Sequence, residues 1–275
     1  MTQSTISFRE KHILQILDLF FNQNLPLDLF IHHYFKSHRA LGSKDRPYIA
    51  DAVYQVVRWY GLLKCWCGPN SSMQELVRTA MAQPIEKLQQ KDGMASYDRV
   101  SFPEWLFSKL KEAYGEDMAI QICTLSNQRA TQAIRTNRLK TTREQLKIAL
   151  EEKLPVRFSS YCPEGLVILQ RANYFQLPEY VRGEFEVQDE GSQLLASLVE
   201  PKPGEHVLDF CSGSGGKSLA IAPQMLGKGQ LYLHDVRKRA LLEAKMRCKR
   251  AGIQNVQFIE ALDPKLKALK GKMDW

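Results

Sequence analysis

The sequence predicts an α/β protein built from an N-terminal helical bundle, a small α+β module and a doubly wound parallel sheet. Apolar residues recur at three- and four-residue spacings through residues 6–65, which is typical of packed helices. Short alternating segments separated by Pro and Gly follow over residues 132–189, which indicates strands. From about residue 190, strands alternate with helices, the order that builds a parallel sheet with right-handed crossovers. We expect domain boundaries at 1–100, 101–185 and 186–275.

The expected helices follow from the apolar spacing and from breaks at Pro and Gly. In the first part they cover residues 8–23, 27–41, 46–63 and 73–83, and Asp45 is the expected cap of the third. A loop over 91–101 precedes two more helices, at 103–117 and 118–129. In the second part, a helix over 141–153 begins after Thr141 or Thr142, among strands at 132–140, 156–160, 165–171 and 184–189. The third part should contain helices at 192–200, 217–226 and 239–252, and strands at 206–210, 231–235 and 256–260.

Charge and cysteine usage narrow the class of protein. The 275 residues carry a formal net charge of +8, with a pI of about 9.1, which favours a polyanionic partner, nucleic acid before a membrane surface. Six cysteines follow no disulfide or zinc-ligand spacing, as in a reducing cytosol. No signal peptide or membrane span is recognisable, so we expect a cytoplasmic location, no membrane partner and a monomer. His32, His33 and His38 are interpreted as surface or packed side chains, and we expect no metal site.

The segment LDFCSGSGGKS, residues 208–218, is the first candidate for a ligand-binding loop. A phosphate-binding P-loop requires glycine five residues before the glycine that precedes its lysine, and that position holds Cys211. The three glycines of the segment instead let the chain turn sharply from strand to helix and approach a ligand closely. A nucleotide hydrolase therefore remains the weaker alternative.

Asp235 is the second feature of a cofactor site. It ends the next expected strand, nineteen residues after Gly216, where an acid can accept hydrogen bonds from both ribose hydroxyls. The alternative is that Asp235 only caps the following helix. In that helix, the apolar stripe of Leu241, Leu242 and Met246 should face the sheet, and most of its basic residues should face outward. These features alone do not separate a dinucleotide from S-adenosylmethionine.

The segments around the loop resemble the Fmu/Sun (RsmB/Nop-type) family of RNA cytosine-5 methyltransferases. The matching stretches are the Q-D-E-G-S-Q start at 188–193, the strand and turn at 209–211, and G-G-K-S at 215–218. Many family members have Ala-Ala-Pro at 212–214, where this chain has Ser-Gly-Ser, and the backbone donors are kept. The segment 234–257 fits the second family motif. RTNRLKTTREQL resembles the start of the family's RNA-recognition module, and LGSKDRPYIADAVYQVVRW resembles its helical N-terminal domain.

The resemblance implies a Rossmann-like class I methyltransferase domain, of which this chain holds the first half. It implies S-adenosyl-L-methionine as cofactor and RNA, ribosomal RNA first, as partner. The implied cofactor-binding residues are Cys211, Ser212, Gly213, Ser214, Gly215, Gly216, Lys217, Asp235 and Asp263, with Glu260 as an alternative to Asp263. The RNA-binding candidates are Arg135, Asn137, Arg138 and Lys140.

The resemblance also implies what the reaction needs. A thiolate must add to ring carbon 6 of the cytosine so that carbon 5 becomes nucleophilic, and the family carries this chemistry on two cysteines after later strands. Neither motif occurs in this sequence, so we name no catalytic residue. We expect a truncated and inactive methyltransferase in which the 206–210 strand is an unpaired sheet edge. The alternative is a non-catalytic RNA-binding remnant, with or without cofactor binding.

Overall fold

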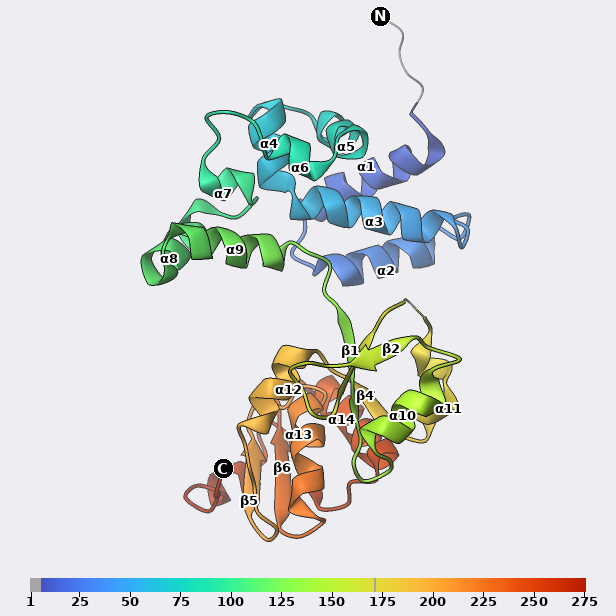
Figure 1. Cartoon of the computed structure of the whole chain (residues 1–275), viewed down its shortest axis with the longest axis vertical. Helices are drawn as coiled ribbons and strands as arrows, with labels where there is room; N and C mark the ends of the chain where they lie inside the picture. The colour runs from blue at the N-terminus through green and yellow to red at the C-terminus, as the bar shows by residue number, and fades with distance from the viewer. Residues whose placement is uncertain (1–5, 171) are drawn as a thin grey trace, which may run out of the picture. The chain divides into compact units, whose positions relative to one another are not determined.

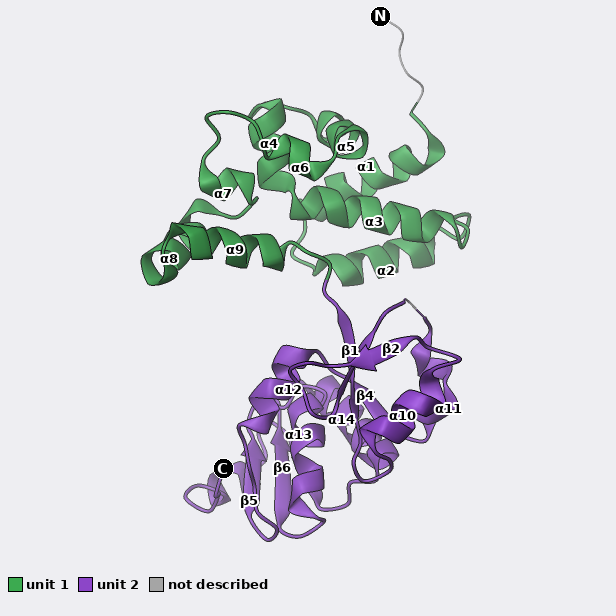
Figure 2. Cartoon of the chain, in the orientation of Figure 1, with its two compact units in different colours: residues 1–129 green, residues 130–275 purple. Residues whose placement is uncertain are grey.

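The computed structural model describes residues 6–170 and 172–275 and confirms the mixed α/β class. The chain divides into two compact units, Met1–Arg129 and Ala130–Trp275 (Figure 2). Unit 1 is helical, and unit 2 contains both sheets (Figure 1). Within the described residues, no helix is long and apolar enough to cross a membrane.

Unit 1 packs α1 to α5 around one apolar core, and α8 and α9 share a second, smaller one. Buried side chains of α1, α2, α3, α4 and α5 meet in the first core, with Ile16, Leu17, Val53 and Leu62 fully buried. The helices of this unit are α1 (Phe8–Phe20), α2 (Leu27–Ser37), α3 (Asp45–Arg58), α4 (Tyr60–Cys67), α5 (Met73–Ala82), α6 (Ile85–Leu88), α7 (Ser96–Arg99), α8 (Glu104–Tyr114) and α9 (Glu116–Ser126). The pair α8 and α9 lies in unit 1.

The expected third helix is wrong in two details. It divides at Trp59 into α3 and α4, because the backbone N–H groups of Gly61 and Leu62 donate to Ser101 Oγ at 3.0 and 3.4 Å. Asp45 does not cap it, because the helix already begins at Asp45. Its carboxylate instead accepts a hydrogen bond from Arg9 Nε at 2.8 Å, which ties α3 to α1.

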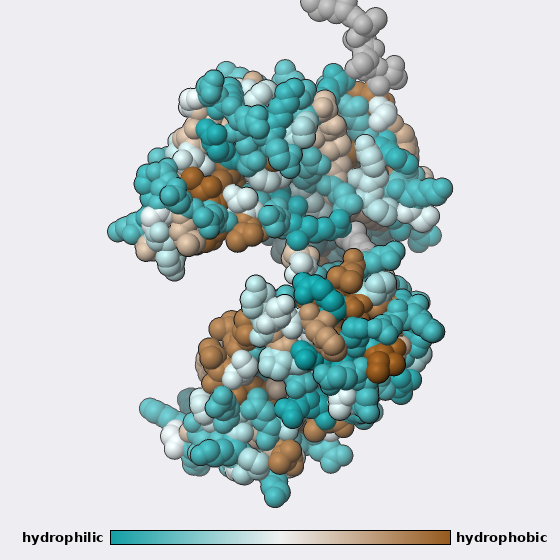
Figure 3. All heavy atoms as spheres, in the orientation of Figure 1, coloured by the Kyte–Doolittle hydropathy of each residue, from teal (hydrophilic) through white to brown (hydrophobic). Residues whose placement is uncertain are grey.

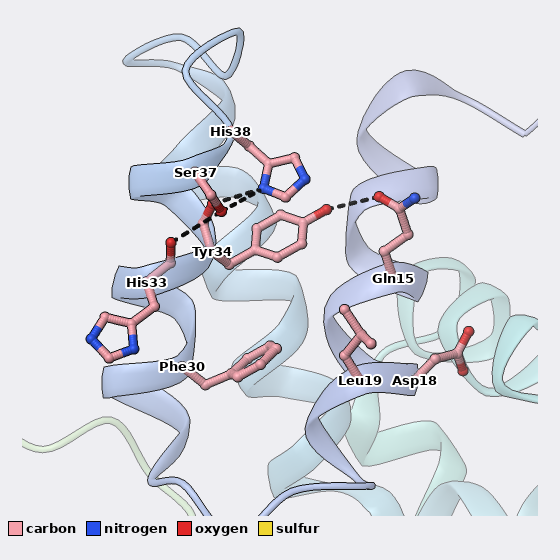
Figure 4. Close-up of a pocket in the computed structure, with 8 residues that line it drawn as sticks. All are labelled: Gln15, Asp18, Leu19, Phe30, His33, Tyr34, Ser37 and His38. Carbon is pink, nitrogen blue, oxygen red and sulfur yellow. Dashed lines mark hydrogen bonds between the residues drawn. The ribbon is translucent and has the colours of Figure 1, made fainter.

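His33 of α2 and His38, which follows α2, line a groove between α1 and α2 (Figure 4), and His32 is exposed outside it. His38 stacks on Tyr34 with ring centroids 3.9 Å apart, and its Nδ1 lies 2.8 Å from the Tyr34 carbonyl oxygen. The Tyr34 hydroxyl donates to Gln15 Oε1 at 2.8 Å. His38 is thus a packed residue that closes the end of α2. Among the described residues, no cluster of three His, Cys, Asp or Glu side chains is placed to hold a metal ion.

Unit 2 begins with a four-stranded antiparallel sheet in the order β2-β3-β1-β4. Thr142 caps its long helix α10 through a reciprocal pair of hydrogen bonds with Gln145, which decides between the two expected caps. The elements are β1 (Gln132–Thr136), α10 (Arg143–Leu150), β2 (Val156–Phe158), β3 (Gly165–Ile168), η1 (Tyr174–Gln176), α11 (Pro178–Val181) and β4 (Phe185–Val187).

A parallel three-stranded sheet in the order β5-β6-β7 completes unit 2. Leu231 and Leu233 of β6 face α13 and α14, whereas Tyr232 packs with α15 on the other face. The elements are α12 (Glu190–Ser197), β5 (His206–Asp209), α13 (Gly216–Ile221), η2 (Ala222–Met225), β6 (Gln230–His234), α14 (Lys238–Ala251), β7 (Val256–Ile259) and α15 (Lys265–Ala268).

The free edge expected at β5 is partly paired. Leu208 N–H donates to the Trp275 carbonyl at 3.1 Å, and Asp274 N–H donates to the His206 carbonyl at 2.9 Å. The Trp275 indole N–H also donates to Glu205 at 3.0 Å. These bonds satisfy backbone groups that would otherwise face solvent on that side of the strand.

The apolar stripe expected on α14 is confirmed for Leu241 and wrong for Leu242 and Met246. Its buried residues are Leu241, Ala244, Cys248 and Ala251, whereas Leu242 and Met246 are 54% and 66% exposed. Small side chains at 244, 248 and 251 let the helix lie close to its neighbours, and their small size had hidden them from the apolar pattern.

The surface of the chain is largely polar, with apolar side chains gathered in small groups (Figure 3). Two of the larger exposed apolar residues are Leu195 of α12 and Leu198 directly after it, which are 58% and 72% exposed. These side chains leave part of α12 uncovered within unit 2.

Candidate functional site

A tight turn joins β5 to α13 and forms the floor of the candidate site. Gly213 and Gly215 have φ values of 55° and 81°, the left-handed conformation that side-chain-bearing residues rarely adopt. A Cβ on Gly215 would lie 3.3 Å from both Ala244 and Leu233, so glycine also permits close packing there. The turn is fixed to β6 by the bond from Ser212 N–H to the His234 carbonyl, 2.9 Å.

Asp235 lies at the end of β6, directly against this turn. Its carboxylate accepts hydrogen bonds from Gly213 N–H at 2.8 Å, Arg237 N–H at 2.8 Å and Arg237 Nε at 3.0 Å. The Arg237 side chain is the main reason that the pKa of Asp235 lies far below its usual range, with the backbone donors adding to the effect. The residue at the N-cap of α14 is Arg237, so Asp235 is not merely the cap of that helix.

A cavity of about 470 Å³ opens beside Asp235, and its wall contains both acids proposed for the third strand end. Asp263 Oδ1 accepts a bond from Lys265 N–H at 2.9 Å, and Glu260 forms an ion pair with Lys238 at 3.2 Å. The structure thus brings Asp235 and Asp263 to one cavity, next to the glycine turn. Lys217 and Cys211 are exposed at the turn.

Asp209 and Arg247 hold the turn in place through hydrogen bonds. Neither residue was among the site residues predicted from the sequence. Ser218 Oγ donates to Asp209 Oδ2 at 2.6 Å, which ties the first turn of α13 to the end of β5. Arg247 Nη1 donates to Ser214 Oγ at 2.8 Å and to the Ser214 carbonyl at 3.1 Å. We expected most basic residues of α14 to face outward, and Arg247 is an exception, because its side chain is only 14% exposed.

Arg247 also connects the cofactor turn to the antiparallel sheet. Its Nε donates to Glu186 of β4 at 3.0 Å, and Arg250 Nη2 donates to the other oxygen of the same carboxylate at 2.6 Å. Glu186 is 1% exposed, and Arg250 stacks on Tyr180 at 4.0 Å. One buried carboxylate therefore holds two arginines, and one of them holds the glycine turn.

Arg135 and Asn137 do not lie on an open surface, contrary to their predicted phosphate contacts. Asn137 is 3% exposed and donates to the carbonyls of Gly183 and Ala251 at 2.8 and 2.9 Å. Arg135 is 5% exposed and donates from Nε to Gln188 Oε1 at 2.7 Å. Both side chains are buried, so neither belongs to an exposed basic surface of the module. Arg138 and Lys140, by contrast, are exposed.

We expect Asn137→Ala to lower the free energy of unfolding of unit 2 by about 2–3 kcal/mol. The change leaves two buried carbonyls without the donor that joins the antiparallel sheet to α14. Urea unfolding followed by circular dichroism measures it. Asn173→Ala is the matched control, because Asn173 is exposed and makes no capping bond, and it should change stability by less than about 0.5 kcal/mol. Equal effects at the two positions would contradict the linking role of Asn137.

Comparison with known proteins finds two matching domain families. Residues 102–174 match the RsmF/B-like ferredoxin-like domain of methyltransferases, and residues 185–275 match the ubiE/COQ5 methyltransferase family. A probable ribosomal RNA small subunit methyltransferase B of Synechocystis is 30% identical over 59% of this chain and 37% of its own length. These matches support the resemblance to the Fmu/Sun family.

Longer matches agree with this resemblance. The ribosomal RNA small subunit methyltransferase B of Enterobacter is 28% identical over 92% of this chain and 62% of its own length. The chain spans about two fifths of the length of the Synechocystis and Bacillus subtilis relatives. The solved protein PH0851 shares the fold, with a TM-score of 0.68, 22% identity, and coverage of 90% of this chain and 68% of its own. NSun6 from Pyrococcus horikoshii, solved with SFG, has a TM-score of 0.54 and 20% identity over 61% of this chain and 67% of its own.

Proposed function

We propose that this chain binds S-adenosyl-L-methionine at the glycine turn and belongs to an RNA methyltransferase acting on carbon 5 of cytosine, with ribosomal RNA as the substrate. The observation that carries the proposal is the ionised Asp235 held against Gly213 at the mouth of a cavity, within an Fmu/Sun sequence. When bound, this cofactor would supply an electrophilic methyl group.

The residues present fit that cofactor. Gly213 and Gly215 bring the backbone close to the ligand, and Asp235 offers a carboxylate to a ribose diol. Asp263 borders the part of the cavity next to Asp235, where a base attached to that ribose would extend. Arg138 and Lys140 are exposed cations on the antiparallel module and are the residues we propose to contact RNA phosphates.

The nucleophile is the part of the reaction that these residues do not supply. The sequence contains no Pro-Cys pair, the family's motif for a catalytic cysteine. Burial raises the pKa of Cys162, and it raises the pKa of Cys248 to about 11, so both thiols stay protonated at neutral pH. We therefore expect the chain of residues 1–275 to bind cofactor and RNA without transferring methyl groups, which is also the behaviour of an RNA-binding remnant.

The test is ligand binding combined with a methyl-transfer assay. S-adenosylhomocysteine at 100 times its dissociation constant should stabilise the folded chain by about 2.7 kcal/mol, visible as a raised melting temperature. ATP with magnesium should give no comparable shift. Labelled S-adenosylmethionine should leave no label on ribosomal RNA. A melt raised by ATP and not by S-adenosylhomocysteine would favour a nucleotide hydrolase and refute the proposal, and label on cytosine would refute the expected inactivity.

A further inference from the structure

A second, smaller cavity lies in unit 2 where the antiparallel module meets α12 and α13. Its volume is about 170 Å³, and its wall includes Arg135 and Cys162 from the module, Gln193 and Ser197 from α12, Ala220 from α13 and Gln224 from η2. It shares no lining residue with the cavity beside Asp235. It is therefore separate from the proposed cofactor site.

Two buried atoms on this wall have unused hydrogen-bonding capacity. Arg135 Nη2 is a donor without a partner among the described residues, although Arg135 Nε is bonded to Gln188. Gln193 Oε1 is an acceptor without a partner among the same residues, although Gln193 Nε2 donates to the Gln188 carbonyl at 2.9 Å. Each residue is 5% exposed. Buried donors and acceptors are nearly always paired, so an unpaired pair of opposite kind at one cavity calls for a ligand.

The charge of Arg135 supports the same conclusion. Burial lowers the pKa of Arg135 to about 10, because the guanidinium loses its hydration. The negative charge of Glu186 offsets this loss only in part. A ligand that offers an acceptor to Nη2 would restore part of the lost solvation. The same ligand must present a donor to Gln193 Oε1.

This pattern selects the chemistry of the ligand. A phosphate offers only acceptors, and its oxygens would be repelled by Gln193 Oε1. The edge of a nucleobase offers a donor and an acceptor side by side, and arginine and glutamine are side chains that read such edges. A volume of about 170 Å³ holds one flat ring. Arg138 also lines the cavity. It pairs with Glu164 of the same wall at 3.4 Å, but its side chain is 66% exposed and a phosphate attached to that base could compete for it.

We propose that this cavity binds one unstacked base of single-stranded RNA, a base other than the one presented to the cofactor. The inference rests on the proposed RNA function, and it changes the predicted role of Arg135 from phosphate contact to base contact. Arg135 and Gln193 read the edge of the base, and Ala220 forms part of the opposite wall.

Two variants test the proposal from two sides of the cavity. Arg135→Lys keeps the positive charge and removes the flat guanidinium. Ala220→Leu fills the cavity from α13 without touching the Arg135–Gln188 bond. Ala268→Leu is the control, the same substitution at an exposed helical alanine outside the cavity. Fluorescence anisotropy then gives the affinity for an eight-nucleotide oligocytidylate and for an abasic oligonucleotide of equal length.

Both cavity variants should weaken oligocytidylate binding about tenfold and leave abasic binding unchanged. Ala268→Leu should change neither, and all variants should keep the wild-type affinity for S-adenosylhomocysteine. Equal losses on both oligonucleotides, or no loss on either, would overturn the base pocket while leaving the RNA function standing. If the wild-type protein binds neither oligonucleotide, the proposed RNA function fails, and the base pocket fails with it. Should Arg135→Lys not fold, Ala220→Leu alone decides.

Discussion

Asp235→Ala should weaken the binding of S-adenosylhomocysteine by roughly 10- to 150-fold, equivalent to about 1.5–3 kcal/mol for hydrogen bonds to a charged group. Asp235 has two roles at the site. Its carboxylate is the acceptor we propose for the ribose hydroxyls, and it already holds the N–H of Gly213 at 2.8 Å. Removing it takes away a ligand contact and loosens the turn on which the cofactor would lie. Isothermal titration calorimetry measures the change directly.

Glu260→Gln is the matched control for Asp235→Ala. Glu260 lines the same cavity, but its side chain is 58% exposed and pairs with Lys238 at the surface. Losing that charge should alter affinity by less than about threefold, since exposed ion pairs contribute little. An Asp235→Ala variant with wild-type affinity would place the ribose elsewhere on the domain.

Glu186→Gln should lower the free energy of unfolding of unit 2 by about 3 kcal/mol. The buried carboxylate is the shared partner of Arg247 and Arg250, and its neutralisation leaves two largely buried guanidinium groups without a counter-charge. Because Arg247 also donates to Ser214, cofactor affinity should fall with stability. Urea unfolding and calorimetry on one preparation measure both.

Glu184→Gln provides the comparison two residues away. Glu184 pairs with Arg182, whose side chain is 55% exposed, so its loss should cost no more than about 1 kcal/mol. Arg247→Lys then separates the two effects of Glu186. It keeps a charge near the carboxylate but cannot reach both Glu186 and Ser214 with a planar fork, so cofactor binding should suffer more than stability. Wild-type cofactor affinity in Arg247→Lys would contradict the link to the turn.

Local pattern was enough to predict most of the elements and the glycine turn. Helical spacing located α1, α2 and α5, and the Gly-rich segment followed by an acid located the cofactor turn. These features depend on residues close together in the chain. Prediction failed where the cause was a contact with a residue distant in the chain. The hydrogen bond from Gly61 N–H to Ser101 accompanies the break at Trp59, and no residue near position 59 indicates that break.

The buried contacts of the site could not be predicted from the sequence, because they also join residues that are distant in the chain. Asn137 bonds to Ala251 and Arg247 bonds to Glu186, and both contacts join segments far apart in the chain. A basic residue on a helix or strand is interpreted as a surface charge until its buried partner is known. The arginines of the module and of α14 were therefore assigned to RNA or solvent, whereas Arg135 and Arg247 lie inside.

The contacts of Asn137, Glu186 and Gly183 have a consequence for how a substrate is presented. A Cβ on Gly183 would lie 2.2 Å from the Arg250 carbonyl, so the strand-bearing module and the long helix touch at the level of their backbones. Backbone contact of this kind leaves little room for a hinge motion between the module and α14. A nucleotide strand lying on the module would reach the methyl donor along one path and with one polarity. The distance between a recognised base and a modified base would then be fixed by the contact between the module and α14.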